Sequence, residues 1–310
     1  MKHPAISILL FSLSSVLKHY IFSAYFYTMK VLPLFSDSLG VRSMATLVEL
    51  DKEKIFIDAS AALGPSRYGL PPHPLEIEAL QNAKKKIAEL AKDCKYHVIT
   101  HYHYDHHDPD ESFYIGKKIF AKRIDSHINR SQQERGLYFK EIFEDKAEII
   151  YCDGEEYEVD GYKIKFSPPF PHGPHGIRLG YVIMVSIENK EKMLFASDVQ
   201  GPVYEKAKDY IIEEMPDLLI MDGPPSYFLG WRFSQDNLEK AEKNLIEIME
   251  KTDCKLILDH HLLRDIKYKE RMKNLYEQYG DRIKTFAEWN GKKNNMLEAK
   301  RNVLWKEYGE

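Results

Sequence analysis

From Met29 onward, the hydrophobic pattern alternates between the short apolar runs of strands and the longer period of helices. Met44–Leu50 and Lys54–Asp58 are predicted to be paired strands, because both are largely apolar and a polar turn separates them. Leu75–Lys92 is predicted to be a helix with lysines opposite its apolar side. That side consists of Leu75, Ala79, Leu80, Ala83, Ile87 and Leu90. A buried strand, Tyr96–Thr100, follows at once.

The rest of the chain continues this alternation. Further strands are predicted at Ala147–Tyr151, Tyr162–Phe166, Leu179–Ile187, Lys192–Ala196, Asp217–Met221 and Lys255–Leu258. A helix is predicted over Gln235–Lys251, with Ser234 as its N-cap, and another over Arg264–Tyr279. The segment Glu111–Lys146 is charged and less regular, so it is predicted to be either a cap over a site or a solvated insertion.

The first 28 residues differ in composition from the rest. An apolar run with serines spans Ile6–Leu17, and Lys18 and His19 interrupt it before an aromatic stretch. This run is short for a membrane-spanning helix, and it lacks the small-residue cleavage site of a signal peptide. We therefore expect residues 1–28 to be an extension outside the fold, with translation beginning at Met29, and residues 29–310 to form a single domain. A membrane anchor remains the alternative.

Overall charge and cysteine content narrow the class of protein. The 310 residues carry a net charge of −4, and the pI is near 6.4, so bulk charge does not indicate nucleic-acid binding. The three cysteines, Cys94, Cys152 and Cys254, are scattered and form no CxxC pair. This argues against a disulfide framework and favours a reducing, cytoplasmic compartment. We expect no stable membrane partner, and the oligomeric state is left open.

Histidines are concentrated directly after the predicted strand Tyr96–Thr100. Four of the 13 histidines fall within residues 101–107, together with Asp105. Imidazole and carboxylate donors suit Zn²⁺, and also Mn²⁺ or Fe²⁺. His101 and His103 are two residues apart, so in an extended chain they point the same way and can share one ion. Asp105 and His106 can face a second ion once the chain has turned. The alternative is a polar, solvated turn.

Other histidines and carboxylates also follow strand signals. His172 and His175 lie in a loop rich in proline and glycine, and Asp198 ends an apolar strand. His260 and His261 follow the last predicted strand. Strand ends that meet at one edge of a sheet form a natural ligand site, whereas core histidines are not expected to gather in this way.

The order of these motifs resembles the metallo-β-lactamase-fold superfamily of metal-dependent hydrolases. The His-x-His-x-Asp-His signature stands at His101, His103, Asp105 and His106, and the later histidines and Asp198 follow in the family's order. Asp58 matches the family's early aspartate at a strand end. The resemblance covers about residues 30 to 290, and it is greatest to a mainly archaeal group rather than to the antibiotic-hydrolysing enzymes.

The resemblance implies a four-layer αββα sandwich with two metal ions at one edge, Zn²⁺ first and Mn²⁺ or Fe²⁺ as alternatives. One ion would be held by His101, His103 and His172, and the other by Asp105, His106 and His260, with Asp198 bridging them. His172 is preferred to His175 because its Pro171–Pro174 context matches the family's loop. His260 is preferred to His261 because it lies nearer the strand, and the spare histidines would then support the ligands or face the substrate.

Such a centre predicts a hydrolase. Two ions lower the pKa of water to about 7 and stabilise charge that develops on the substrate, and Asp105 would orient the resulting hydroxide. The expected substrate is a small-molecule ester, thioester, lactone or phosphoester. The alternatives are a nuclease or phosphodiesterase on the same fold, which the acidic charge balance disfavours, and a non-hydrolytic metal-binding protein. Fold analogy cannot choose the substrate.

Five further residues have two interpretations each. Asp222 could border the cleft or cap local amides, and Asp259 could orient a ligand histidine or simply end a strand. Arg178 and Arg232 could hold an anionic substrate, although surface ion pairs are the more common role. His73, in a proline-rich loop, is expected to be structural.

Overall fold

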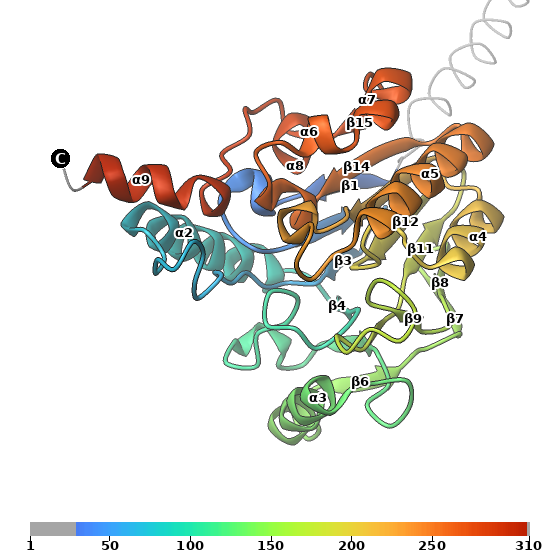
Figure 1. The fold of residues 1–310 in the computed structure, drawn as a ribbon. Coiled ribbons are helices and arrows are strands. Elements are labelled where there is room, and N and C mark those ends of the chain that lie inside the picture. The colour runs from blue at the N-terminus through green and yellow to red at the C-terminus, as the bar shows by residue number, and fades with distance from the viewer. Residues whose placement is uncertain (1–28, 309–310) are drawn as a thin grey trace, which may run out of the picture.

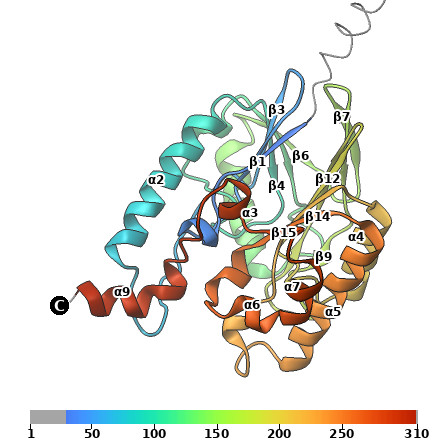
Figure 2. The ribbon, with the colours of Figure 1, turned by 90° about the horizontal axis from the view of Figure 1, so that it is seen from above.

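Two β-sheets pack face to face, and helices cover the outer face of each, so the chain forms four layers (Figures 1 and 2). The computed structural model describes residues 29–308, and the predictions for residues 1–28 lie outside this range. The first sheet has six strands in the order β1-β2-β3-β4-β5-β6. Their bounds are Lys30–Pro33, Thr46–Glu49, Lys54–Ile57, Tyr96–Ile99, Lys118–Ala121 and Glu148–Tyr151.

The second sheet has seven strands in the order β15-β14-β13-β12-β11-β8-β7. Numbered from β7 upward, they span Glu156–Val159 (β7), Tyr162–Phe166 (β8), Val185–Glu188 (β11), Lys192–Ser197 (β12), Leu218–Asp222 (β13), Lys255–Asp259 (β14) and Ile283–Lys284 (β15). A separate small hairpin pairs β9 (Phe170–Pro171) with β10 (Tyr181–Val182). This hairpin carries the proline- and glycine-rich loop.

Three groups of buried apolar side chains hold the layers together. Ile55, Val98, Phe195 and Ile257 belong to the core between the two sheets. Helices α2 (Pro74–Ala91) and α3 (Arg130–Phe143) pack on the first sheet. Helices α4 (Glu205–Glu214), α5 (Gln235–Thr252) and α7 (Lys273–Tyr279) pack on the second. The other helices of residues 29–308 are α6 (Tyr268–Arg271), α8 (Phe286–Trp289) and α9 (Arg301–Tyr308).

The strand and helix predictions are largely confirmed. The paired strands β2 and β3, the buried strand β4 and the helix α2 lie where the hydrophobic pattern placed them. Ser234 caps α5, because its side chain accepts a hydrogen bond from Asn237 N at 3.1 Å. In α2, Leu75 is 46% exposed, contrary to the predicted stripe. Glu76 is buried in that first turn instead, where it binds Arg301 at 2.7 Å.

Three predicted segments differ in the structure. Glu111–Lys146 is not a separate cap: it supplies β5 to the first sheet and α3 to its outer layer, where Phe139 and Phe143 are buried. The strand predicted over Leu179–Ile187 is divided between β10 and β11, because the intervening Ile183 N donates to Thr100 O at 3.1 Å. The helix predicted over Arg264–Tyr279 is divided into a 3₁₀ turn (His260–Arg264), α6 and α7.

The parallel strands of the two sheets end at a common edge. β3 runs parallel to β4, and β12, β13 and β14 run parallel to one another. The Thr100 Oγ1 atom after β4 lies 2.7 Å from the Ser197 Oγ atom at the end of β12, which joins the two sheets there. Asp58, Ser197 and His260 have φ of 50°, 54° and 47°, a left-handed conformation that costs free energy for non-glycine residues. Such conformations gather at functional sites.

Among residues 29–308, no helix combines the length and hydrophobicity needed to cross a lipid bilayer.

Candidate metal centre

The histidine-rich loop turns sharply after β4. His106 N and His107 N both donate to His103 O, at 2.9 and 3.2 Å, and this tight turn sends Asp105 and His106 back toward His101. The rings of His101 and His106 are 4.1 Å apart between centroids, and those of His101 and His103 are 4.7 Å apart. The loop therefore presents its predicted donors to one place.

Asp198 lies at the centre of the cluster and is 1% exposed. Its Oδ2 atom faces the Nε2 atoms of five imidazoles within 3.8 Å. The distances are 3.1 Å to His172, 3.2 Å to His106, 3.5 Å to His260, and 3.8 Å to both His101 and His261. The other oxygen, Oδ1, is buried without a hydrogen-bond partner among residues 29–308. Five imidazole nitrogens cannot all donate to one oxygen, so hydrogen bonding alone does not account for this arrangement.

Carboxylates hold the far side of three of these rings through Nδ1. The pairs are Asp58–His106 at 2.8 Å, Asp37–His260 at 2.9 Å and Asp222–His261 at 2.7 Å. Burial raises the pKa of Asp58, and burial with the neighbouring Asp198 raises that of Asp222 well above its usual range. Where such a carboxylate is ionised it can only accept, so Nδ1 is then the donor and a neutral ring turns the lone pair of Nε2 toward the centre. Lone pairs that face a carboxylate repel it unless a cation lies between them. Metal-ligating histidines carry this kind of outer partner, so the residues present fit divalent cations.

The donor atoms fall into overlapping groups, and within each group they lie within 4.8 Å of one another. The groups are His101, His103, His172 and Asp198; Asp105, His106 and His260; Asp58, His101 and His106; and Asp198, His260 and His261. All seven residues predicted from the sequence as metal ligands are thus brought together. The first two groups match the two predicted ion positions, and Asp198 lies near both.

In the metal-free protein, the negative charge of Asp198 favours the protonated forms of His106 and His260. Burial lowers the pKa of His106 and of His260, but Asp198 opposes it, so the pKa of His106 is well above its usual value and that of His260 is about 9. Burial and the neighbouring imidazoles hold the pKa of His101 well below its usual value, and burial lowers that of His103 to about 3. Burial raises the pKa of Asp198, but His106 and His260 bring it well below its usual range. Cation binding at His106 and His260 therefore releases protons.

The doubled histidines have different surroundings at each position. His175 is exposed and stacks on Tyr204 with 5.6 Å between ring centroids, away from the cluster that contains His172. His107 is buried and its Nδ1 bonds to His103 O at 3.0 Å, so it supports the loop. His260 and His261, in contrast, both reach Asp198.

The five residues with two interpretations have defined surroundings. His73 is structural, since its Nδ1 accepts from Leu75 N at the start of α2. Asp259 accepts from the backbone amides of Ser38, His260 and Phe286, and does not contact the ring of His260. Asp222 is fully buried. It accepts a hydrogen bond from the backbone amide of Gln200, as expected of a residue that caps local amides, and it also contacts His261 Nδ1. Arg178 and Arg232 are exposed, and Arg232 lies 4.1 Å over the ring of Trp231.

Two residues of the centre were missed by sequence reasoning. Asp37 orients His260, and Arg264 Nε donates to Asp37 Oδ1 at 3.0 Å. Arg264 Nη2 also lies 3.8 Å from Asp105 Oδ2, so the guanidinium adds a buried positive charge beside the donors. Asp37 follows no strand and precedes no motif, and it has no sequence signal, whereas Arg264 lies four residues after His260.

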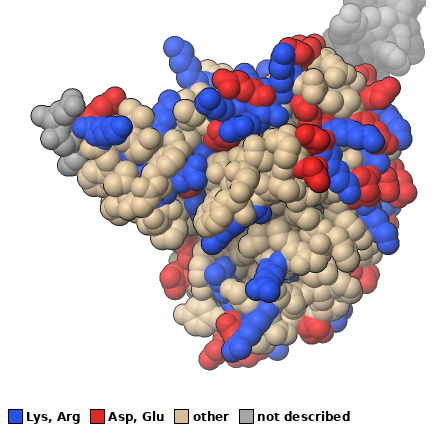
Figure 3. Space-filling model, viewed as in Figure 1, with Lys and Arg blue, Asp and Glu red and all other residues tan. Residues whose placement is uncertain are grey.

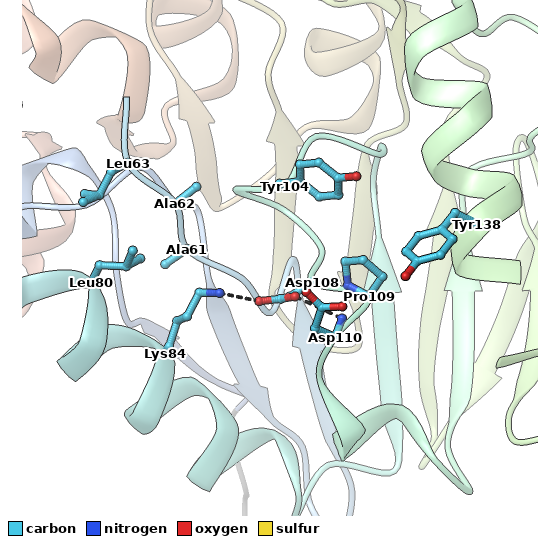
Figure 4. A pocket seen from close by; sticks show the side chains of 10 residues that line it. All are labelled: Ala61, Ala62, Leu63, Leu80, Lys84, Tyr104, Asp108, Pro109, Asp110 and Tyr138. Atoms are coloured by element: carbon cyan, nitrogen blue, oxygen red, sulfur yellow. Dashed lines mark hydrogen bonds and ion pairs between the residues drawn. The ribbon is translucent and has the colours of Figure 1, made fainter. Parts of the chain in front are cut away.

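A cavity of about 380 Å³ lies on the outer side of the histidine-rich loop (Figure 4). Tyr104 from the loop and Tyr138 from α3 line one part, and Lys84 from α2 lines another. Lys84 Nζ binds Asp108 Oδ2 at 2.7 Å, and the remaining walls are mainly apolar. Tyr104 lies between His103 and Asp105 in the chain, but none of the predicted metal ligands lines this cavity.

Charges on the face viewed in Figure 3 are unevenly spread. Lys, Arg, Asp and Glu side chains mix around the periphery, whereas several Lys or Arg side chains stand around the tan, hollowed middle of this face. The face carries no continuous basic surface.

No protein-family model matches the chain. Individual relatives do match. A UPF0282 protein of Methanopyrus kandleri is 42% identical over 291 residues, which covers 89% of this chain and 99% of the relative. The chain belongs to the UPF0282 family. A UPF0282 protein of Methanocaldococcus jannaschii is likewise 42% identical over 290 residues, covering 89% and 96% of the two chains. Both relatives are archaeal, as expected from the sequence.

The UPF0282 chain also resembles solved structures. A possible metal-dependent hydrolase from Veillonella parvula superposes with a TM-score of 0.51 at 14% identity, covering 83% of this chain and 95% of that one. This likeness concerns the fold. Together with the layer order and the two sheets, it confirms the predicted αββα sandwich of the metallo-β-lactamase type.

Proposed function

We propose that this UPF0282 protein is a metal-dependent hydrolase with a dinuclear centre, occupied by Zn²⁺ or alternatively by Mn²⁺ or Fe²⁺. The proposal is carried by the surroundings of Asp198, whose Oδ2 atom faces five imidazole nitrogens. Carboxylates hold three of those rings through their Nδ1 atoms. This is the donor chemistry of divalent transition-metal sites with nitrogen and oxygen ligands.

The residues divide into two proposed ligand sets. His101, His103 and His172 would hold one ion, and Asp105, His106 and His260 would hold the other, with Asp198 between them. Divalent ions supply a nucleophilic hydroxide near neutral pH and stabilise negative charge on the substrate. Asp105 has an 18% exposed side chain, in contrast to the fully buried His106 and His260. It is therefore proposed both to bind an ion and to orient the nucleophile toward an entering substrate.

The proposed substrate is a small-molecule ester, thioester, lactone or phosphoester. The cavity beside Tyr104, about 380 Å³, falls in the size range of small-molecule sites, roughly 300–1,000 Å³, but none of the proposed ligands lines it. A nuclease is disfavoured by the net charge of −4 and by the mixed charges in Figure 3.

The proposal is tested by metal-dependent turnover. The purified protein is stripped with a chelator, reconstituted separately with Zn²⁺, Mn²⁺ or Fe²⁺, and assayed on a panel of model esters, thioesters, lactones and phosphodiesters. We expect at least one substrate to be hydrolysed only after reconstitution, and Asp198→Asn to abolish that gain. A protein that binds the ions and hydrolyses no member of the panel would favour the non-hydrolytic alternative.

A further inference from the structure

His261 is held in the same way as the histidines assigned to the centre. Its Nδ1 atom lies 2.7 Å from Asp222 Oδ2, and Asp222 is itself fixed by Gln200 N at 2.9 Å. Asp222 is fully buried, and His261 is 8% exposed. The ring therefore has one orientation, and its Nε2 atom is turned toward Asp198 at 3.8 Å.

The surroundings of His261 connect it to both proposed ion positions. Its ring centroid is 4.5 Å from that of His260 and 5.5 Å from that of His172. Asp198, His260 and His261 form one of the groups whose donor atoms all lie within 4.8 Å of one another. The seven residues predicted from the sequence already supply four donors to each ion when Asp198 bridges. The Nε2 atom of His261 is therefore one nitrogen donor more than these sets contain.

We propose that His261 is an eighth donor of the centre and gives the ion shared by Asp198 and His260 more than four protein ligands. The proposal rests on the proposed dinuclear centre and deepens it. Four protein donors complete a tetrahedral ion, as in structural zinc sites. A further nitrogen favours an ion that accepts five or six ligands, such as Mn²⁺, Fe²⁺ or Co²⁺. The adjacent pair His260–His261 would thus act as two ligands rather than as one ligand and one spare.

The alternative role for His261 is a contact with substrate. His261 has an 11% exposed side chain, as expected of a group at the cleft, but the proposed ligand Asp105 is more exposed at 18%. Exposure alone therefore does not separate the two roles. Metal affinity does, because a residue that only contacts substrate leaves the affinity for the ion unchanged.

The test compares wild type with His261→Ala, His261→Gln and the control His175→Ala, which removes an exposed histidine from the neighbouring loop. Co²⁺ is titrated into each metal-free protein, and its affinity and visible absorption are recorded. We expect His261→Ala and His261→Gln to weaken one of two equivalents by at least 10- to 100-fold, the loss typical of outer partners of metal ligands. The absorption of that ion should also rise, since lower coordination strengthens the d–d bands. His175→Ala should match wild type.

The outcomes separate the inference from the function on which it rests. If both His261 variants bind two equivalents with wild-type affinity and spectrum, His261 is not a ligand and the inference is overturned, even if turnover changes. If the wild type itself binds no Co²⁺, the dinuclear centre fails and the inference fails with it. Asp222→Asn gives a second measurement that leaves His261 in place, and it should weaken the same equivalent.

Discussion

Asp37 Oδ2 lies 2.9 Å from His260 Nδ1, although the two residues are 223 positions apart in the chain. The link brings the segment between β1 and β2 into the centre, and Arg264 fixes Asp37 from the other side at 3.0 Å. The orientation of His260 thus depends on a residue outside every motif of the chain.

Asp37→Asn should weaken binding of one ion. The amide oxygen still accepts, but without the negative charge that makes His260 a stronger donor. Loss of such an outer partner typically costs 10- to 100-fold in metal affinity. Competition against a chromophoric chelator measures the change. Asp125→Asn is the matched control, because Asp125 is an exposed carboxylate paired with Arg123 on the surface, and an equal effect of both variants would remove Asp37 from the centre.

Asp198→Asn and Asp105→Asn should fail in different ways. Asp198 is the proposed bridge, so its replacement removes the charge that compensates the repulsion between two cations, and metal content should fall. Asp105→Asn should keep more of its metal but lose roughly 10²–10⁴-fold in turnover, the range for a lost acid–base or orienting group. Metal analysis and steady-state rates are measured on the same preparations. An Asp198→Asn variant with both ions and full turnover would disprove the bridge.

His106→Ala and His107→Ala distinguish two neighbouring buried histidines. His106 faces Asp198 and is held by Asp58, whereas His107 bonds only to the backbone of the loop. His106→Ala should lose an ion, while His107→Ala should keep its metal and lower the melting temperature. Metal content and thermal unfolding check both. The reverse pattern would show that the donors of this loop are misassigned by one residue.

The pH dependence of stability should reveal the ion pair that anchors the C-terminal segment. Arg42 binds Glu298 through two bonds of 2.6 Å. Burial alone raises the pKa of Glu298, but Arg42 reverses this and lowers it from 4.5 to about 2. Because the folded pKa is depressed, the pair stabilises the fold above about pH 4.5, and this stability is lost as the pH falls toward 2.

Glu298→Gln should therefore reduce the free energy of unfolding near neutral pH by on the order of 3 kcal/mol, the equivalent of that pKa change. Denaturant unfolding at pH 7 and at successively lower pH measures the difference between variant and wild type. The difference should shrink as the pH falls from about 4.5. A difference that stays constant with pH would mean that the ionised pair is not its source.

The sequence anticipated those parts of the fold and centre that depend on local pattern. The strand before His101 was recognisable because Tyr96–Thr100 is mostly apolar and β-branched. The donors His101, His103, Asp105 and His106 were recognisable because they lie within six residues of one another in the chain. The order of the later motifs was informative because each follows a strand, and parallel strands end at one edge.

Features set by distant contacts could not be predicted. Glu111–Lys146 is charged, yet some of its apolar residues are buried by β5 and α3, whereas Leu137 and Tyr138 on α3 stay exposed. The choice between His172 and His175 depends on how the β9–β10 hairpin folds back, and the roles of Asp37 and Asp222 depend on partners 223 and 39 positions away. In each case the decisive interaction is tertiary, and no local pattern encodes it.

Metal stoichiometry shows whether the cluster around Asp198 holds two divalent ions. The protein is stripped of metal, reconstituted with Zn²⁺, Mn²⁺ or Fe²⁺ under anaerobic conditions, desalted and subjected to elemental analysis. We expect close to two equivalents per chain for at least one metal. A stoichiometry that stays near zero for all three metals would contradict it.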